Sequence, residues 1–145
     1  MRVELVAFVF MPEHVHLLVW PLLREPDVGR FLARLKQPFS KEIKRTLQVK
    51  GSPLLDKLTV RERPGKTCFR YWHEGPGFDR NIYSTEARAA ALDYIHNNPV
   101  KRGLCMDAVS WKWSSARFYL SDPASQQVSE LPHIHGIPAG AFDEA

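Results

Sequence analysis

Two histidines separated by one residue, His14 and His16, give the strongest chemical signal in the sequence. On a β-strand, side chains at positions i and i+2 point to the same face of the sheet, so both imidazoles could reach one divalent cation. The flanking residues 8–10 and 17–19 are strongly apolar. Two titratable rings in such a strand cost desolvation energy unless they have partners. The alternative is a pair of half-buried histidines that happen to alternate, and the sequence leaves both interpretations open.

A second signal is the segment that runs from Tyr94 to Asn98. In a helix these two residues are four apart and share one face. The same face continues back through Ala91 and Ala87, whose small side chains would let the helix lie close to a sheet. A tyrosine hydroxyl and an amide oxygen could then reach one point together. The alternative is a buried tyrosine and an asparagine that caps the end of the helix.

Joined, these signals predict a three-ligand site, made of His14, His16 and the Asn98 amide oxygen, with Tyr94 beside it. A free tyrosine side chain has a pKa of about 10 and needs help to act as a nucleophile. A cation that polarises a phosphodiester would provide this help. The product would be a phosphotyrosine, and the reaction would need no nucleotide cofactor. The lack of a Walker-type glycine-rich loop in the sequence agrees with this chemistry.

The elements that must position these residues follow from hydrophobic patterning. Residues 3–10 and 14–20 are rich in β-branched and aromatic types and predict an antiparallel hairpin. Ser84 predicts the N-cap of a helix that ends near Asn98, because the residue before a proline avoids the helical region.

The other predicted elements are less regular. We expect a helix over 27–37 capped by Asp27, an interruption at Pro38, a continuation from Ser40 to Gly51, a loop over 51–66, a short strand over 69–73, and a strand or loop with a short helix over 104–120. The predicted organisation is one domain over residues 1–120 and a tail over residues 121–145.

Cations concentrate in one stretch of a chain whose formal net charge is +4. Between Arg30 and Lys50, seven cations are opposed only by Glu42. Such a stripe suits a phosphate backbone, although a solvated helix face is an equally good interpretation. The residues that we expect to contact such a backbone are Arg34, Lys36, Lys41, Lys44, Arg45, Lys101 and Arg102.

Composition narrows the protein class. The two cysteines, Cys68 and Cys105, form no CxxC pair and suggest a reducing compartment. No stretch approaches the roughly 18 apolar residues of a membrane span, and Glu4 interrupts the N-terminal apolar run where a signal peptide would have none. We therefore expect a cytoplasmic protein with no membrane contact.

The sequence resembles a known family at these same positions. Residues 11–19 (Met-Pro-Glu-His-Val-His-Leu-Leu-Val) resemble the HUH motif of single-tyrosine transposases. Residues 94–104 (Tyr-Ile-His-Asn-Asn-Pro-Val-Lys-Arg-Gly-Leu) resemble the tyrosine motif of the REP-associated branch of that superfamily. Residues 78–82 and 111–115 are similar to further segments of the same branch, so the resemblance covers roughly residues 3–120.

The resemblance implies a ferredoxin-like α+β fold, with an antiparallel sheet backed by helices. It also implies a bacterial, nucleoid-associated protein. It implies that His14, His16 and Asn98 hold Mg²⁺ or Mn²⁺ and that Tyr94 is the nucleophile. Histidine ligands suit Mn²⁺ better than Mg²⁺, which prefers oxygen. The implied activity cleaves and rejoins single-stranded DNA through a 5'-phosphotyrosine at hairpins of palindromic REP-type repeats, and a homodimer is one of the arrangements left open.

The chain departs from the family pattern at its start. Family members carry another strand and helix before the strand that begins here at Val3. A late start codon, a truncated gene and a strand supplied by a partner are the three explanations. Two alternative functions stay open: a domesticated or truncated DNA-binding module without catalysis, and a metal-dependent phosphodiester hydrolase that uses water as the nucleophile.

Three further groups of residues need an interpretation. His133 and His135 form a second His-x-His in a proline-flanked segment, which we interpret as a decoy. His96 would point away from Tyr94 on a helix, so we assign it no catalytic role. Trp111 and Trp113 could stack on bases, but we expect them to pack in the core.

Overall fold

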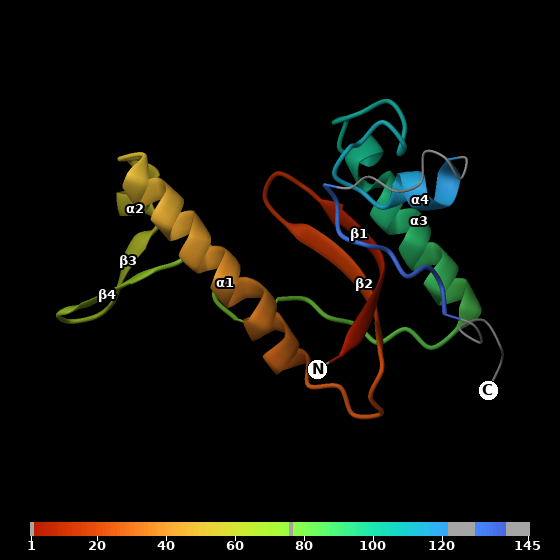
Figure 1. Cartoon of the computed structure of the whole chain (residues 1–145), viewed down its shortest axis with the longest axis horizontal. Coiled ribbons are helices and arrows are strands. Elements are labelled where there is room, and N and C mark those ends of the chain that lie inside the picture. The colour runs from red at the N-terminus through yellow and green to blue at the C-terminus, as the bar shows by residue number, and fades with distance from the viewer. Residues whose placement is uncertain (1, 76, 122–129, 139–145) are drawn as a thin grey trace. The chain divides into compact units, whose positions relative to one another are not determined.

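The computed structural model describes residues 2–75, 77–121 and 130–138 (Figure 1). Its elements are β1 (Val3–Phe10), β2 (Val15–Pro21), α1 (Val28–Val49), α2 (Leu54–Lys57), β3 (Thr59–Arg63), β4 (Lys66–Phe69), α3 (Thr85–Lys101) and α4 (Ala116–Leu120). They form two compact units: one spans residues 25–80, and the other combines residues 2–24 with the chain from Asn81 onward. Each unit holds one two-stranded antiparallel sheet with helices. The predicted α+β class is confirmed, and the arrangement is compatible with a ferredoxin-like fold.

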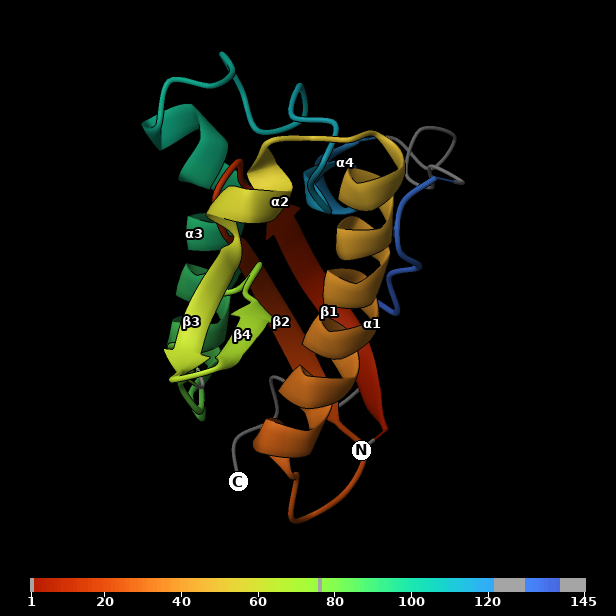
Figure 2. The same cartoon turned by 90° about the vertical axis from the view of Figure 1, so that its left-hand side faces the viewer.

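The hairpin of β1 and β2 is the framework of the second unit (Figure 2). Phe8 lies opposite Leu17 and Val9 lies opposite His16, so the predicted antiparallel pairing is confirmed. A bulge between Leu5 and Ala7 shifts the register near the start of β1. The alternation of side chains in this register places His16 on the same face as Val9.

Helix α3 covers that face of the hairpin. Ile95 of α3 packs with Ala7, Val9 and Met11 in a buried cluster. The Ser84 hydroxyl accepts a hydrogen bond from the Ala87 amide at 3.1 Å, which confirms the predicted N-cap.

The predicted end of this helix at Asn98 is wrong, because α3 continues through Pro99 to Lys101. Pro99 is fully buried, and the amides of Arg102 and Leu104 donate to the carbonyls of Asn98 and Pro99. Burial of the ring and these bonds offset the hydrogen bond that a proline cannot make.

The edge of β1 away from β2 is contacted by two later segments. Phe10 donates its amide to the Trp113 carbonyl at 2.8 Å, and Val9 forms a bridge with Ser114. Near the other end of the strand, the His135 amide donates to the Leu5 carbonyl at 3.0 Å. The described part of the predicted tail, residues 130–138, thus lies against the sheet. Because most of residues 121–145 lie outside the described residues, the predicted boundary at residue 120 stays a prediction.

The first unit is built around one long helix, α1. The Asp27 carboxylate accepts from the Arg30 amide at 2.8 Å, which confirms the predicted N-cap. The predicted interruption at Pro38 is wrong, because the helix runs unbroken from Val28 to Val49. A proline removes one backbone hydrogen bond and strains one turn, and here the turns on either side keep the helix together.

The predicted loop over residues 51–66 is also wrong. This stretch contains α2, strand β3 and the start of β4, and the strands pair with Val60 opposite Cys68. Gly65 allows the tight turn between them, because it adopts a positive φ of 75°. The predicted strand over 69–73 is wrong beyond Phe69, where β4 ends.

Residues 71 and 72 form instead an aromatic cluster with α1. The Tyr71 and Trp72 rings lie 5.3 Å and 5.7 Å from the Phe39 ring, and the Trp72 indole donates to the Lys36 carbonyl at 3.2 Å. No helix in the described stretches of either unit is long and apolar enough to cross a membrane.

Candidate active site

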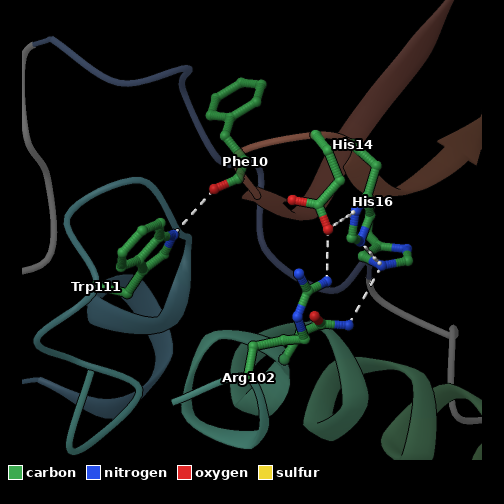
Figure 3. Close-up of polar contacts among 7 residues, drawn as sticks. Phe10, His14, His16, Arg102 and Trp111 are labelled. Carbon is green, nitrogen blue, oxygen red and sulfur yellow. Dashed lines mark hydrogen bonds and ion pairs between the residues drawn. The ribbon is translucent and has the colours of Figure 1, made fainter. Parts of the chain in front are cut away.

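The two histidines of the hairpin converge on one point. His14 immediately precedes strand β2, and His16 is the second residue of that strand. Their Nε2 atoms are 3.0 Å apart, and their rings stand nearly perpendicular, at 85° (Figure 3). The predicted orientation on one face is therefore what the structure shows. A single proton between the two Nε2 atoms satisfies this contact when no cation is present.

The geometry of the pair fits a divalent cation. Two nitrogens that bind one ion at about 2.1 Å and at right angles are about 3.0 Å apart. The Nε2 separation of 3.0 Å in the structure matches this spacing. Within the described residues, no group of three or more His, Cys, Asp or Glu side chains could hold a metal. A cation here would therefore depend on Asn98 and on oxygens from water and substrate.

Helix α3 brings the other two predicted residues to the histidines. The Asn98 side chain is buried, and its Nδ2 lies 3.3 Å from His16 Nε2. Rotation of the amide by 180° exchanges its nitrogen and oxygen, and the oxygen is the atom that a cation requires. The Tyr94 ring lies 5.3 Å from the His16 ring, edge to face, and is about half exposed. Tyr94 and Asn98 are four residues apart, so one helical face presents both.

The electrostatics favour an unprotonated His16. Partial burial, reinforced by the charge of the neighbouring His14, lowers the pKa of His16 below its usual value. A neutral imidazole keeps the lone pair that a metal ligand needs. His16 could therefore serve as a metal ligand.

The structure places an acidic residue beside the site that the sequence motifs did not single out. Glu13 Oε1 lies 3.2 Å from His14 Nδ1 and accepts a hydrogen bond from Arg102 Nη1 at 2.5 Å. The hydrogen bond from Arg102 holds the pKa of the Glu13 carboxyl below its usual value. Glu13 directly precedes His14 in the sequence, and this position is the signal that could have identified it as a neighbour of the site.

The cations predicted to contact DNA fall into three groups. Lys101 places its Nζ 5.7 Å from the centre of the Tyr94 ring, on the exposed side of α3. The Arg102 guanidinium forms an ion pair with the Glu13 carboxylate. The remaining predicted residues, on α1, belong to the other unit and are Arg34, Lys36, Lys41, Lys44 and Arg45.

Because α1 is unbroken, each of its cationic side chains can be assigned to one face of the helix. At about 100° per residue, Lys41 and Lys44 fall on one side together with three arginines, all within about 100° of one another. We call this set the α1 basic stripe; its members are Arg30, Arg34, Lys41, Lys44 and Arg45. Lys36 lies about 130° from the middle of the stripe. Its Nζ instead lies 5.9 Å from the Trp72 ring.

The His96 side chain forms buried contacts that hold elements of the fold together. Its buried ring places Nε2 2.9 Å from Ser115 Oγ, which also contacts the Phe8 carbonyl at 3.1 Å and accepts from the Phe8 amide at 2.9 Å. Burial lowers the pKa of His96. These contacts tie α3 to β1 and to the start of α4, on the side of the helix away from Tyr94.

The two tryptophans differ in their surroundings. Trp111 packs against the buried cluster, and its indole donates to the Phe10 carbonyl at 3.0 Å, as Figure 3 shows. The expectation of core packing is confirmed for Trp111. It is wrong for Trp113, which is 46% exposed with Lys112 Nζ 4.9 Å from its ring. Trp113 reaches the sheet through its backbone, so its ring is free to face outward.

Comparison with known proteins adds one relative. The chain is 28% identical over 112 residues to a Haemophilus influenzae protein named "Putative REP-associated tyrosine transposase". The matched region is 77% of this chain and 58% of the relative, so the chain spans little more than half the length of that protein. No known family model and no solved structure matches the chain. The similarity supports a transposase-like protein in general terms.

Proposed function

We propose that this protein is a single-strand DNA transposase that cuts and rejoins DNA through a 5'-phosphotyrosine on Tyr94. One observation carries the proposal: Tyr94 and Asn98 of α3 meet the His14–His16 pair of the hairpin at one place. These four residues come from two distant segments, with 82 positions between His16 and Asn98, and together they supply two imidazoles, a phenol and an amide. The similarity to the Haemophilus influenzae protein supports the same conclusion.

The His14, His16 and Asn98 side chains would hold a divalent cation, Mn²⁺ or Mg²⁺. Two imidazole nitrogens suit Mn²⁺, while water and phosphate oxygens would complete the shell for either ion. When bound, the cation supplies Lewis-acid polarisation of the phosphodiester. His14 and His16 fix its place through rings already set at a ligating separation of 3.0 Å.

Tyr94 carries out the covalent step. Its hydroxyl oxygen forms a bond to phosphorus, and the bond from phosphorus to the 3'-oxygen of the preceding nucleotide breaks. The 3'-oxygen takes up a proton as the tyrosine loses one. Rejoining reverses these changes, when a 3'-hydroxyl attacks the phosphotyrosine and Tyr94 regains a proton. The number of phosphodiester bonds is conserved, so the reaction needs no external energy source.

The substrate class follows from access and charge. Tyr94 is about half exposed, and the Lys101 ammonium beside its ring can pair with the phosphate that the hydroxyl attacks. An unpaired strand lets a phosphate approach a side chain that stands on a helix surface. The relative is named as REP-associated, and the resemblance of residues 94–104 implies REP-type palindromes as the target. The α1 basic stripe would contribute backbone contacts.

A covalent-adduct assay tests the proposal. The protein is mixed with labelled single-stranded DNA from repeats flanking its own gene, in Mn²⁺ or Mg²⁺, beside Tyr94→Phe, His14→Ala and a Tyr83→Phe control. Tyr83 is an exposed tyrosine outside the site. We expect a denaturant-resistant protein–DNA band that is lost in the first two variants and kept in the third.

Two other outcomes identify the alternative functions. Free product ends with no adduct would mean a hydrolase that uses water as its nucleophile. Binding that is equal in the parent and the Tyr94→Phe variant, with no cleavage in either, would mean a DNA-binding module without catalysis.

A further inference from the structure

One carboxylate oxygen lies between the candidate cation site and the end of α3. Glu13 Oε1 contacts His14 Nδ1 at 3.2 Å and Arg102 Nη1 at 2.5 Å. Glu13 belongs to the turn between β1 and β2, and Arg102 is the C-cap of α3, 89 positions later. The three side chains form a chain of contacts that begins outside the site and ends on one of its ligands.

The contact with Glu13 favours hydrogen on Nδ1 of His14. A carboxylate can only accept hydrogen bonds, and Glu13 Oε1 lies 3.2 Å from His14 Nδ1. Hydrogen on Nδ1 is therefore the favoured arrangement. In a neutral imidazole the other nitrogen then keeps its lone pair. That other nitrogen is Nε2, the atom that faces His16 Nε2 at 3.0 Å.

Arg102 holds the carboxylate in place and links it to the other half of the site. The Arg102 amide donates to the Asn98 carbonyl at 3.1 Å, so its backbone is fixed to the turn of α3 that carries Asn98. Its guanidinium then reaches the turn that carries His14. The pair thus joins the two elements that must stay in register for His14 and Asn98 to share one cation.

We propose that Glu13 and Arg102 are positioning residues of the cation site: Glu13 holds His14 as the Nδ1–H tautomer with Nε2 ready to bind, and Arg102 holds Glu13. This inference rests on the proposed cation site of His14 and His16. Carboxylates that orient a histidine ligand in this way raise metal affinity in other proteins.

The simpler role is an ordinary surface ion pair. The side chains of Glu13 and Arg102 are 51% and 50% exposed, and ion pairs at that exposure contribute little to folding stability. The two roles make different predictions. A tether is restored by any pair of opposite charges, whereas the tautomer of His14 needs an acceptor at position 13.

The test measures Mn²⁺ affinity of the full chain by calorimetry or by the electron paramagnetic resonance of free Mn²⁺. The variants are Glu13→Ala, Arg102→Gln and the reversed pair Glu13→Arg with Arg102→Glu. Glu42→Gln is the matched control, because Glu42 forms an exposed ion pair with Arg45 at 2.6 Å. We expect Glu13→Ala and the reversed pair to weaken Mn²⁺ binding by about ten- to hundredfold, with a smaller loss for Arg102→Gln. The control should bind like the parent.

A second readout needs no metal. Long-range ¹⁵N–¹H correlation spectra of the metal-free chain distinguish the two tautomers of each histidine. We expect His14 as Nδ1–H in the parent and a shift toward Nε2–H in Glu13→Ala, with unchanged thermal unfolding. Parent affinity in the reversed pair or in Glu13→Ala, or an Nε2–H tautomer for His14 in the parent, would overturn the inference. A parent that binds no Mn²⁺ but shows the Nδ1–H tautomer would instead count against the proposed cation site.

Discussion

Neutralising two lysines of the α1 basic stripe should change how DNA binding depends on salt. Lys41 and Lys44 are exposed and lie on the same face of α1. Log K falls as log salt rises, and each phosphate of single-stranded DNA that a cation neutralises makes this slope more negative by about 0.7. If both lysines contact the backbone, the slope of the Lys41→Gln/Lys44→Gln double variant should be less negative than that of the parent by about 1.4.

The measurement is fluorescence anisotropy of a labelled single strand at several salt concentrations. The helix offers a matched control in Lys36→Gln, which removes one charge from outside the stripe. Lys36 lies beside the Trp72 ring, so we expect its substitution to leave the slope unchanged, although the sequence had grouped it with the DNA-binding residues. Equal slopes for the parent and the double variant, or an equal loss in Lys36→Gln, would refute the assignment of the stripe.

Three further predictions concern stability, pH and metal. Ser115→Ala should lower the free energy of unfolding by about 3 kcal/mol, because it leaves the buried Phe8 amide and His96 ring without their hydrogen-bond partner. Ser84→Ala removes an exposed helix cap and should lower it by about 1 kcal/mol. Urea unfolding that ranked the two variants the other way would contradict these contacts. Burial raises the pKa of Tyr119 to about 12, and its hydroxyl donates a hydrogen bond to the Val6 carbonyl at 2.7 Å. The protonated hydroxyl therefore stabilises the fold fully below pH 10, and this stabilisation is lost as the pH rises through 12. A titration followed by tyrosinate absorbance should show a late step that the Tyr119→Phe variant lacks. Chelation with EDTA should abolish adduct formation and Mn²⁺ should restore it, whereas an adduct that persists in EDTA would rule out the cation requirement.

The residues of the candidate site could be predicted from the sequence because their geometry is local. Side chains two apart on a strand and four apart on a helix have fixed relations, so His14 with His16, and Tyr94 with Asn98, needed only a secondary-structure assignment. That the two pairs meet depends on how α3 packs on the hairpin. The apolar positions Val9 and Ile95 determine this packing, and motif spacing does not show it.

The wrong secondary-structure predictions came from residues whose local conformational preference is overridden by the surrounding structure. Pro38 and Pro99 predicted breaks, but both stand inside helices, where the neighbouring turns or burial of the ring offset the missing hydrogen bond. The stretch 51–66 is polar and contains prolines, yet it forms α2 and most of a hairpin. Its strands are short and largely exposed, so they carry little of the apolar alternation by which a strand is predicted.

Long-range polar contacts left no pattern in the sequence. Glu13 and Arg102 are 89 residues apart, and neither residue type nor spacing predicts that they meet. The second His-x-His could not be placed either. Ile134 between its histidines is buried, and the His135 amide donates to the Leu5 carbonyl of β1, although the sequence predicted a tail over residues 121–145. The assignment of that pair as a decoy stays a prediction.

The most direct test of the central claim is to locate the DNA on the protein chain. After adduct formation and nuclease digestion, trypsin should release residues 89–101, a peptide whose one tyrosine is Tyr94. We predict that mass spectrometry finds a nucleotide bound to this peptide, at Tyr94. A nucleotide on Tyr71, Tyr83 or Tyr119, or cleaved DNA with no modified tyrosine, would contradict the account.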